Sequence, residues 1–233
     1  MTALNLPVAN GMIPAAVLFD CDGVIVDSEG PTCALLIDDL ATRGLPLTLD
    51  ALTRHYIGGT IETVAARARS AGALLPEAWV DDIYARMYAM LRAGVPLIPG
   101  VVAVLDALDT AGVPFAMASN GTAEKMAITL GQHGLAHRFR VILSGQAIGR
   151  PKPAPDIYLM AAQACGAAPE LCVVVEDSPS GAQAAQAAGI RCMGYAPHGP
   201  HTPLAEGLIA AGAVLFHRMD DLPMLLGLPG RSA

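Results

Sequence analysis

The chain has 233 residues; 53% of them are hydrophobic, 15% are charged, and the formal net charge is −7. This length allows one substantial domain, or a domain with an insertion, with enough apolar side chains for a packed core. The acidic balance argues against a nucleic-acid partner bound through its phosphates, and Gly, Pro or charged residues interrupt every apolar run before it could span a membrane. We therefore expect a soluble, cytoplasmic protein that acts on a small molecule, with no nucleic acid and no membrane among its partners.

The cysteines and the N-terminal residues agree with this expectation. The five cysteines are scattered along the sequence, and none shows the spacing of a zinc site or of a disulfide framework. They are expected to be small buried side chains in a reducing compartment. The first fourteen residues have no basic region of the kind that opens a signal peptide, so no leader is predicted.

The first predicted element is a short apolar strand that ends at two aspartates. Residues 17–19 are followed by Asp20, Cys21, Asp22 and the turn residue Gly23. Two carboxylates at this point can hold a hard cation such as Mg²⁺ and leave room for phosphate and water. An aspartate beside such a metal can also attack phosphorus. The alternative is a turn followed by a helix N-cap, since Asp satisfies free amides in both settings.

The segment after residue 28 is predicted to be helical. Apolar residues recur there every three or four positions between Gly and Pro breaks, which predicts helices over 31–43, 48–55, 60–71 and 76–93. Residues 29–96 are therefore expected to form a small helical cap domain inserted after the first strand. Pro96 and Pro99 are expected to mark the return hinge.

Strands and helices alternate in the rest of the chain. Strands are predicted over 113–118, 139–143, 171–175, 190–194 and 213–216, and helices over 100–111, 122–133, 155–165, 179–188 and 219–226. Residues 197–203 are expected to be a loop. Apolar strands that alternate with helices of this length indicate parallel βαβ units covered on both faces. We therefore predict an α/β fold, in which residues 1–28 and 97–233 form a doubly wound, Rossmann-like core with a parallel sheet.

Ser119, Asn120 and Gly121 follow the strand over 113–118 and directly precede a predicted helix. Ligands in an open α/β sheet bind beyond the carboxyl ends of the strands, and a hydroxyl beside free helix N-terminal amides can bind an anion. These residues are therefore candidates for a phosphate site. They could also be the N-cap of the helix over 122–133; the two interpretations are compatible, because a capping hydroxyl can face a ligand.

Lys152 stands between Pro151 and Pro153, in a loop that follows the strand over 139–143. The two prolines remove backbone freedom that such a loop would otherwise have. Most surface lysines are merely solvated. A lysine held in this way near a strand end is instead a candidate for binding a carboxylate and a phosphate oxygen together.

Glu176 and Asp177 end the strand over 171–175. This segment could merely cap the helix over 179–188, with Ser178 or Asp177 as the N-cap. If instead the two acids meet Asp20 and Asp22 at the same edge of the sheet, four acids would repel one another strongly without a cation. The sequence thus predicts a Mg²⁺ site formed by Asp20, Asp22, Glu176 and Asp177.

The four motifs, in this order, resemble those of the haloacid dehalogenase superfamily. The resemblance covers residues 15–196 and is closest to the subfamily of β-phosphoglucomutase and phosphoglycolate phosphatase, which also has an Asp-Thr/Ser pair at Asp27-Ser28 and a helical insertion. It implies a Mg²⁺-dependent phosphatase that hydrolyses a small phosphomonoester, such as a sugar phosphate or a sugar-acid phosphate. The reaction would pass through an aspartyl-phosphate intermediate.

The resemblance also implies a role for each residue. Asp20 is expected to attack phosphorus, and Asp22 to protonate the leaving group and then to activate water. Lys152 is expected to act with Ser119, Asn120 and Gly121 on the charge of the transferring phosphate. Mg²⁺ would be held by Asp20, by the main-chain carbonyl of Asp22 and by Asp177, with Glu176 bound directly or through water.

Alternatives remain open. The protein could be a phosphoglycolate phosphatase or a phosphomutase of the β-phosphoglucomutase type. The mutase has a histidine shortly after its Asp-Thr/Ser pair, where this chain has Thr32, and basic cap residues around a glycine, where this chain has residues 58–62. A dehalogenase would have no use for Asp22, and a silent binding protein on this fold would not need the intact acids. The cap is expected to set substrate choice, with Arg54, His55 and the turn at Gly58-Gly59 as candidate contacts. Arg54 and His55 could instead only end a helix. A monomer is expected.

Overall fold

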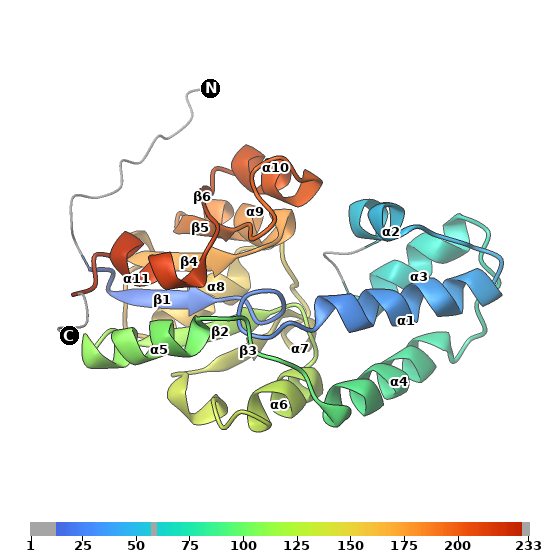
Figure 1. Ribbon diagram of the computed structural model, residues 1–233, viewed down its shortest axis with the longest axis horizontal. Coiled ribbons are helices and arrows are strands. Elements are labelled where there is room, and N and C mark those ends of the chain that lie inside the picture. The colour runs from blue at the N-terminus through green and yellow to red at the C-terminus, as the bar shows by residue number, and fades with distance from the viewer. Residues whose placement is uncertain (1–12, 57–59, 230–233) are drawn as a thin grey trace.

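The computed structural model describes residues 13–56 and 60–229 and has a six-stranded parallel sheet at its centre (Figure 1). The strand order is β3-β2-β1-β4-β5-β6. The strands are β1 (Ala16–Phe19), β2 (Phe115–Ser119), β3 (Ile142–Ser144), β4 (Cys172–Glu176), β5 (Arg191–Tyr195) and β6 (Val214–Phe216). Strand β1 lies between β2 and β4, and the carboxyl ends of these three strands carry the predicted site residues.

Helices cover both faces of this sheet, so its central strands are buried on both sides. Successive side chains of β1 point to opposite faces: Val17 and Phe19 join one apolar cluster, and Ala16 and Leu18 join another. The first cluster is completed by α5 (Val101–Thr110), α6 (Ala123–Gly131) and α11 (Leu222–Leu225), and the second by α8 (Asp156–Ala164), α9 (Pro179–Ala187) and α10 (Pro203–Ala210). The predicted doubly wound α/β fold is confirmed.

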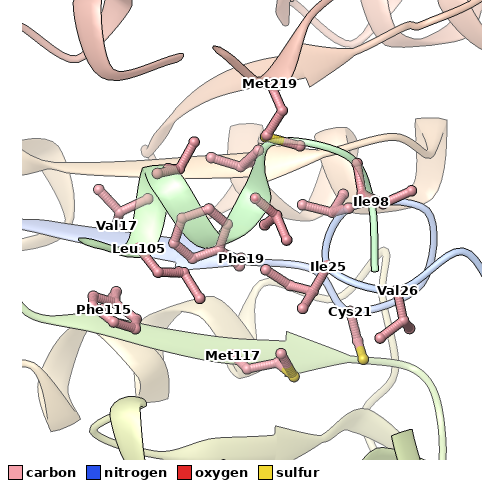
Figure 2. Close-up of a cluster of buried hydrophobic side chains, with 14 of the residues drawn as sticks. Val17, Phe19, Cys21, Ile25, Val26, Ile98, Leu105, Phe115, Met117 and Met219 are labelled. Atoms are coloured by element: carbon pink, nitrogen blue, oxygen red, sulfur yellow. The ribbon is translucent and has the colours of Figure 1, made fainter. Parts of the chain in front are cut away.

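Figure 2 shows the first cluster around Phe19 and Phe115, whose rings meet edge to face. Cys21 lies in this cluster with Ile25 and Val26 and is only 1% exposed. The residue between the two aspartates therefore anchors the loop after β1 in the core.

Residues 29–93 contribute four helices with an apolar cluster of their own. These are α1 (Glu29–Thr42), α2 (Leu49–His55), α3 (Ile61–Ser70) and α4 (Trp79–Ala93). Leu36, Leu52 and Trp79 lie at the centre of that cluster. The buried carboxylate of Asp39 joins α1 to α4, because it accepts hydrogen bonds of 2.6 Å from the Trp79 indole and the Arg86 guanidinium. Removing either donor would leave a buried charge poorly compensated.

The two chain segments that connect these helices to the sheet run side by side. Val26 forms an antiparallel bridge with Leu97. The amide of Asp27 donates to the Pro96 carbonyl over 2.9 Å, and the amide of Ile98 donates to the Ile25 carbonyl over 2.9 Å. The loop that carries the aspartates is thereby held next to the point where the chain returns to the sheet.

Two helices were not anticipated from the sequence: α7 (Gly145–Ile148) and α10. Helix α10 begins at Pro203, the residue that was expected to end a loop. Proline is favourable at the first position of a helix, where its missing amide is not needed, and the Thr202 hydroxyl caps this turn by accepting from the Ala205 amide over 3.2 Å. The third strand begins at Ile142 rather than at residue 139. Among the described residues, the helices are all too short or too polar to cross a membrane.

Candidate active site

A cavity of about 990 Å³ lies between the carboxyl edge of the sheet and helices α1 to α4. The predicted residues that line it are Asp20, Asp22, Arg54, Ser119, Asn120, Gly121, Lys152 and Asp177. Apart from Arg54, they come from four separate motifs, so the fold brings together residues that are as far as 157 positions apart in the sequence, the interval from Asp20 to Asp177. Glu176 lies directly behind this surface, fully buried.

Lys152 forms the centre of the buried polar network. Its ammonium lies 2.6 Å from Asp20 Oδ1 and 2.6 Å from Glu176 Oε1, and its side chain is only 2% exposed. Tyr158 places its ring 4.8 Å from the same ammonium and donates to Glu176 Oε1 over 2.7 Å. Burial by itself lowers the pKa of Lys152, but the carboxylates of Asp20 and Glu176 outweigh it and raise that pKa above its usual value. The lysine is therefore held as a cation.

Asn120 fixes the main chain of Lys152. Its side-chain oxygen accepts from the Lys152 amide over 2.8 Å, and its side-chain nitrogen donates to the Lys152 carbonyl over 3.2 Å. The side chain of Asn120 thus connects the end of β2 to the proline-flanked loop. Both of its polar groups are used for this contact.

Glu176 is saturated by donors from the protein. Besides Lys152 and Tyr158 on Oε1, the amide of Asp177 and the amide and hydroxyl of Ser178 donate to Oε2 over 2.9 to 3.1 Å. This position depends on Gly181, because a Cβ there would lie 1.6 Å from Glu176 Oε1. Helix α9 can approach the carboxylate only because residue 181 has no side chain.

Three acids form a set of oxygen ligands that could hold a metal ion. Carboxylate oxygens of Asp20, Glu176 and Asp177 lie within 4.8 Å of one another. Burial raises the pKa of Asp20 to about 7, against the effect of Lys152, and burial with the neighbouring acids raises the pKa of Asp177 well above its usual range. Crowded carboxylates with too little nearby positive charge, and with only oxygen ligands, fit a hard divalent cation.

Gly23 brings the loop after β1 against Asp177. It has a φ of 71°, and a Cβ at this position would lie 1.9 Å from Asp177 Oδ2. A residue with a side chain would be strained there and would displace the carboxylate. The turn residue after the two aspartates therefore allows both acidic motifs to share one site.

Asp22 is held by a residue that the sequence reasoning missed. The ammonium of Lys125, on α6, lies 2.7 Å from Asp22 Oδ1, and the Ser28 hydroxyl donates to the same oxygen. Lys125 lies inside a helix, with no motif around it to single it out. One signal was available: Lys125 and Lys152 are the only lysines in the sequence.

Ser119 is buried, and its hydroxyl does not cap helix α6. Thr122 does so instead, since its hydroxyl accepts from the Lys125 amide over 3.0 Å. Ser119 Oγ accepts from the Gly121 amide over 3.0 Å at the cavity wall. Of the two N-caps considered for the helix over 179–188, Ser178 is the one that caps α9, since its hydroxyl accepts from the Gly181 amide over 3.1 Å. Ser119 and Asp177 are therefore not used as caps.

The candidate contacts in the cap lie in different settings. Arg54 lines the cavity, but its side chain is 51% exposed and is paired with Asp50 over 2.8 Å. His55 is exposed and is not among the described residues that line the cavity; its carbonyl accepts from Arg67 over 2.7 Å. Thr32 lines the cavity with its hydroxyl bonded to the Ser28 carbonyl. The predicted turn at residues 58–59 lies outside the described residues.

Residues 14–189 match the family model of the haloacid dehalogenase-like hydrolases. The chain belongs to this family. The resemblance stated from its four motifs is confirmed, and the same motifs line the cavity in this structure.

Curated relatives agree with this match. The chain is 32% identical over 213 residues to a phosphoglycolate phosphatase of Xylella fastidiosa, covering 88% of this chain and 93% of the relative. It is also 32% identical over 206 residues to the chloroplastic protein SUPPRESSOR OF QUENCHING 1 of Arabidopsis thaliana. The matched region covers 84% of this chain but only 18% of that much longer protein.

Solved structures of the family share the fold. A HAD family hydrolase from Deinococcus radiodurans with bound phosphate and sodium is 35% identical, with a TM-score of 0.73 over 92% of this chain and 97% of the other. A variant of CbbY from Rhodobacter sphaeroides, in complex with xylulose-(1,5)bisphosphate, is 26% identical, with a TM-score of 0.77 over 94% and 100%. The predicted enzyme class, a phosphoric monoester hydrolase of the haloacid dehalogenase superfamily, is confirmed.

Proposed function

We propose that this family member is a Mg²⁺-dependent phosphatase that hydrolyses a small phosphomonoester through an aspartyl-phosphate on Asp20. The observation that carries the proposal is the contact of Lys152 with both Asp20 and Glu176, at the edge of a cavity that also contains Asp22 and Asp177. A nucleophile, a cation for the phosphate and a second carboxylate for proton transfer are thereby present in one site.

In the first step, an Asp20 oxygen attacks phosphorus and the bond to the leaving oxygen breaks. Lys152 and the Ser119 hydroxyl are placed to stabilise negative charge on the phosphoryl oxygens, which is the main requirement of this chemistry. Asn120 acts by holding the main chain of Lys152. Its proposed phosphate role is therefore indirect.

Asp22 is proposed to give a proton to the leaving oxygen and then to take one from the water that hydrolyses the aspartyl-phosphate. It lines the cavity two residues after the nucleophile, and its side chain remains 20% exposed, so it can reach substrate. Proton transfer in both directions requires a carboxylate within hydrogen-bonding reach of the reacting oxygen.

The proposed metal ligands are the carboxylates of Asp20 and Asp177 and the main-chain carbonyl of Asp22. Glu176 has both oxygens occupied by protein donors, which favours an indirect role, through water or through Lys152. When bound, Mg²⁺ supplies the positive charge that the crowded acids lack and draws the phosphate toward Asp20.

The proposed substrates are a sugar phosphate, a sugar-acid phosphate or phosphoglycolate. A phosphatase named for phosphoglycolate and a structure holding a sugar bisphosphate are among the related proteins. The cavity of about 990 Å³ is large enough for a phosphorylated sugar. Hydrolysis is favoured over the mutase alternative because the related enzymes at this level of identity are named as phosphatases.

The test is phosphate release from a panel of sugar phosphates, phosphoglycolate and 4-nitrophenyl phosphate, with Mg²⁺ and with excess chelator. We expect release that requires Mg²⁺ and is absent in Asp20→Asn, and the preferred member of the panel identifies the substrate class. A folded protein that releases no phosphate from any member, or that does so equally well without metal, would contradict the proposal.

A further inference from the structure

The only two lysines of the sequence both line the cavity, whereas the other twelve of its 14 Lys and Arg side chains are arginines. Lys152 is paired with Asp20, and Lys125 is paired with Asp22. We propose that Lys125 is a positioning residue which, together with Ser28, holds the carboxylate of Asp22 in place for proton transfer. This inference rests on the proposed phosphatase function.

The contact geometry is specific to one oxygen of Asp22. Lys125 Nζ lies 2.7 Å from Oδ1, and the Ser28 hydroxyl donates to that same oxygen. The two donors reach it from different elements, α6 and the start of α1. An aspartate has few rotamers, and two directed donors on one oxygen select one of them. Among the described residues, both of these contacts to the carboxylate use Oδ1.

The placement of Lys125 is built into the structure. Its side chain is only 11% exposed, and an unpaired ammonium in such a position would be costly to bury. Gly121 borders both side chains, because a Cβ on that residue would lie in ordinary van der Waals contact, 3.4 Å from Lys125 Cδ and 3.6 Å from Asp22 Oδ2. The ammonium of Lys125 is held against Asp22 by its burial and by the ion pair between them.

The turn of α6 that carries Lys125 is also tied to the cap. The Tyr88 hydroxyl of α4 lies 2.6 Å from Thr122 Oγ1, which caps α6, and Arg92 of α4 is paired with Glu124 over 2.6 Å. These contacts hold α4 against α6, and neither of them involves Asp22. Loss of Lys125 should affect the step that uses Asp22 and should have little effect on phosphate binding by Lys152.

The test compares a substrate that needs a protonated leaving group with one that does not. We expect Lys125→Met to lower kcat/KM for the best alkyl phosphate of the panel by about tenfold or more, because the variant should lose part of the rate enhancement that general acid–base catalysis contributes. For 4-nitrophenyl phosphate, whose leaving group is stable as an anion, the loss should be within about threefold. In an Asp22→Asn background, Lys125→Met should have no further effect.

A matched control removes a neighbouring cation without touching Asp22. Arg92→Met breaks the ion pair with Glu124, next to Lys125, and should leave the ratio of the two substrates unchanged. An equal loss on both substrates in Lys125→Met, or a loss that persists in the Asp22→Asn background, would overturn the inference while leaving the phosphatase function intact. A wild-type protein without any phosphatase activity would overturn both.

A second measurement does not depend on the Lys125 variant being folded. Because the sequence has two lysines, ¹⁵N-lysine labelling yields two ammonium signals in an NMR spectrum. We expect both to be protected from exchange in the wild-type protein, and only the Lys125 signal to shift or disappear in Asp22→Asn. An unprotected Lys125 ammonium, or a signal that Asp22→Asn leaves unchanged, would overturn the proposed contact.

Discussion

At the scale of single residues, two lysines and a group of buried acids determine the chemistry of the cavity. Lys152 balances part of the charge of Asp20 and Glu176, and Lys125 balances Asp22. This leaves an excess of acid around Asp20 and Asp177, and burial together with these neighbouring acids raises the pKa of both carboxyl groups. The same excess that makes the site suitable for a cation makes it unfavourable for folding when no cation is bound.

Replacement of Asp20 by Asn should therefore stabilise the metal-free protein while abolishing turnover. The pKa of Asp20 lies near 7 in the folded protein, above its ordinary value of 3.8, so ionisation opposes folding. This cost is absent below about pH 4, grows as the pH rises toward 7 and is complete above it. A pKa difference of one corresponds to about 1.4 kcal/mol, so Tm should rise by about 2 °C or more at pH 8.

Thermal unfolding of both proteins with chelator, at pH 5 and pH 8, checks this expectation. The gain from Asp20→Asn should be clearly larger at pH 8, and added Mg²⁺ should stabilise the wild-type protein more than the variant. An Asn variant that is less stable than the wild type at pH 8 would mean that Asp20 mainly supports the structure through Lys152.

At the scale of elements, the site depends on loops and helix starts that approach one another unusually closely. Helix α9 begins against the carboxylate of Glu176, and the loop after β1 passes directly over Asp177. Glycine makes both approaches possible, at residues 181 and 23. The carboxyl ends of neighbouring parallel strands supply the side chains, and these close approaches bring them within reach of one ion.

Gly181→Ala should disrupt the site although residue 181 lies outside the cavity. The added Cβ would lie 1.6 Å from Glu176 Oε1 and must displace that carboxylate, which in turn supports Lys152. We expect a fall in kcat/KM of about tenfold or more and a loss of stability of about 1–3 kcal/mol. Steady-state kinetics and denaturant unfolding measure the two effects.

Gly131→Ala is the matched control, because it also adds a methyl group to a helical glycine. Nothing lies within 4 Å of a Cβ at residue 131, so the substitution should leave activity unchanged and stability equal or slightly higher. Equal behaviour of the two variants would show that Glu176 can move without consequence for the site.

At the scale of the whole molecule, side-chain contacts join the helical segment to the sheet domain across the cavity. Gln146, on α7, donates to Glu62 of α3 over 2.7 Å and to the Tyr84 hydroxyl of α4 over 3.2 Å. Further contacts join α4 to α6 at Tyr88 and Arg92. A closed arrangement over the site excludes water from the phosphate and its leaving group.

Gln146→Ala should loosen this arrangement without unfolding the protein. The loss of two hydrogen bonds across the cavity, each worth about 0.5–1.5 kcal/mol, should raise KM by about two- to tenfold and change Tm little. Arg150→Ala is the control, because Arg150 is an exposed residue just after α7 that pairs with Asp156. If both variants have the same KM as the wild type, the Gln146 contact does not help to retain substrate.

Much of the fold and of the site could be predicted from the sequence. The apolar strands, the helix spacing and the acids at strand ends are local patterns, and they predicted the doubly wound sheet correctly. They also indicated that Asp20, Lys152 and Asp177 lie near one edge of the sheet, where the three residues line one cavity. Helices α7 and α10 were not predicted because both are short. Helix α10 also begins with proline, a residue that more often indicates the end of a helix. The roles of the cap residues Arg54 and His55 stay predictions.

The sequence by itself determined which chemistry is available, because the types of side chain and their places at strand ends follow from local patterns of apolar and polar residues. Only the tertiary structure decided which contacts each of these residues makes in the site. It directed Asn120 to the main chain of Lys152, surrounded Glu176 with donors and brought Lys125 to Asp22. Such contacts join residues distant in the chain, and their formation depends on how helices pack against the sheet, which a local pattern does not encode.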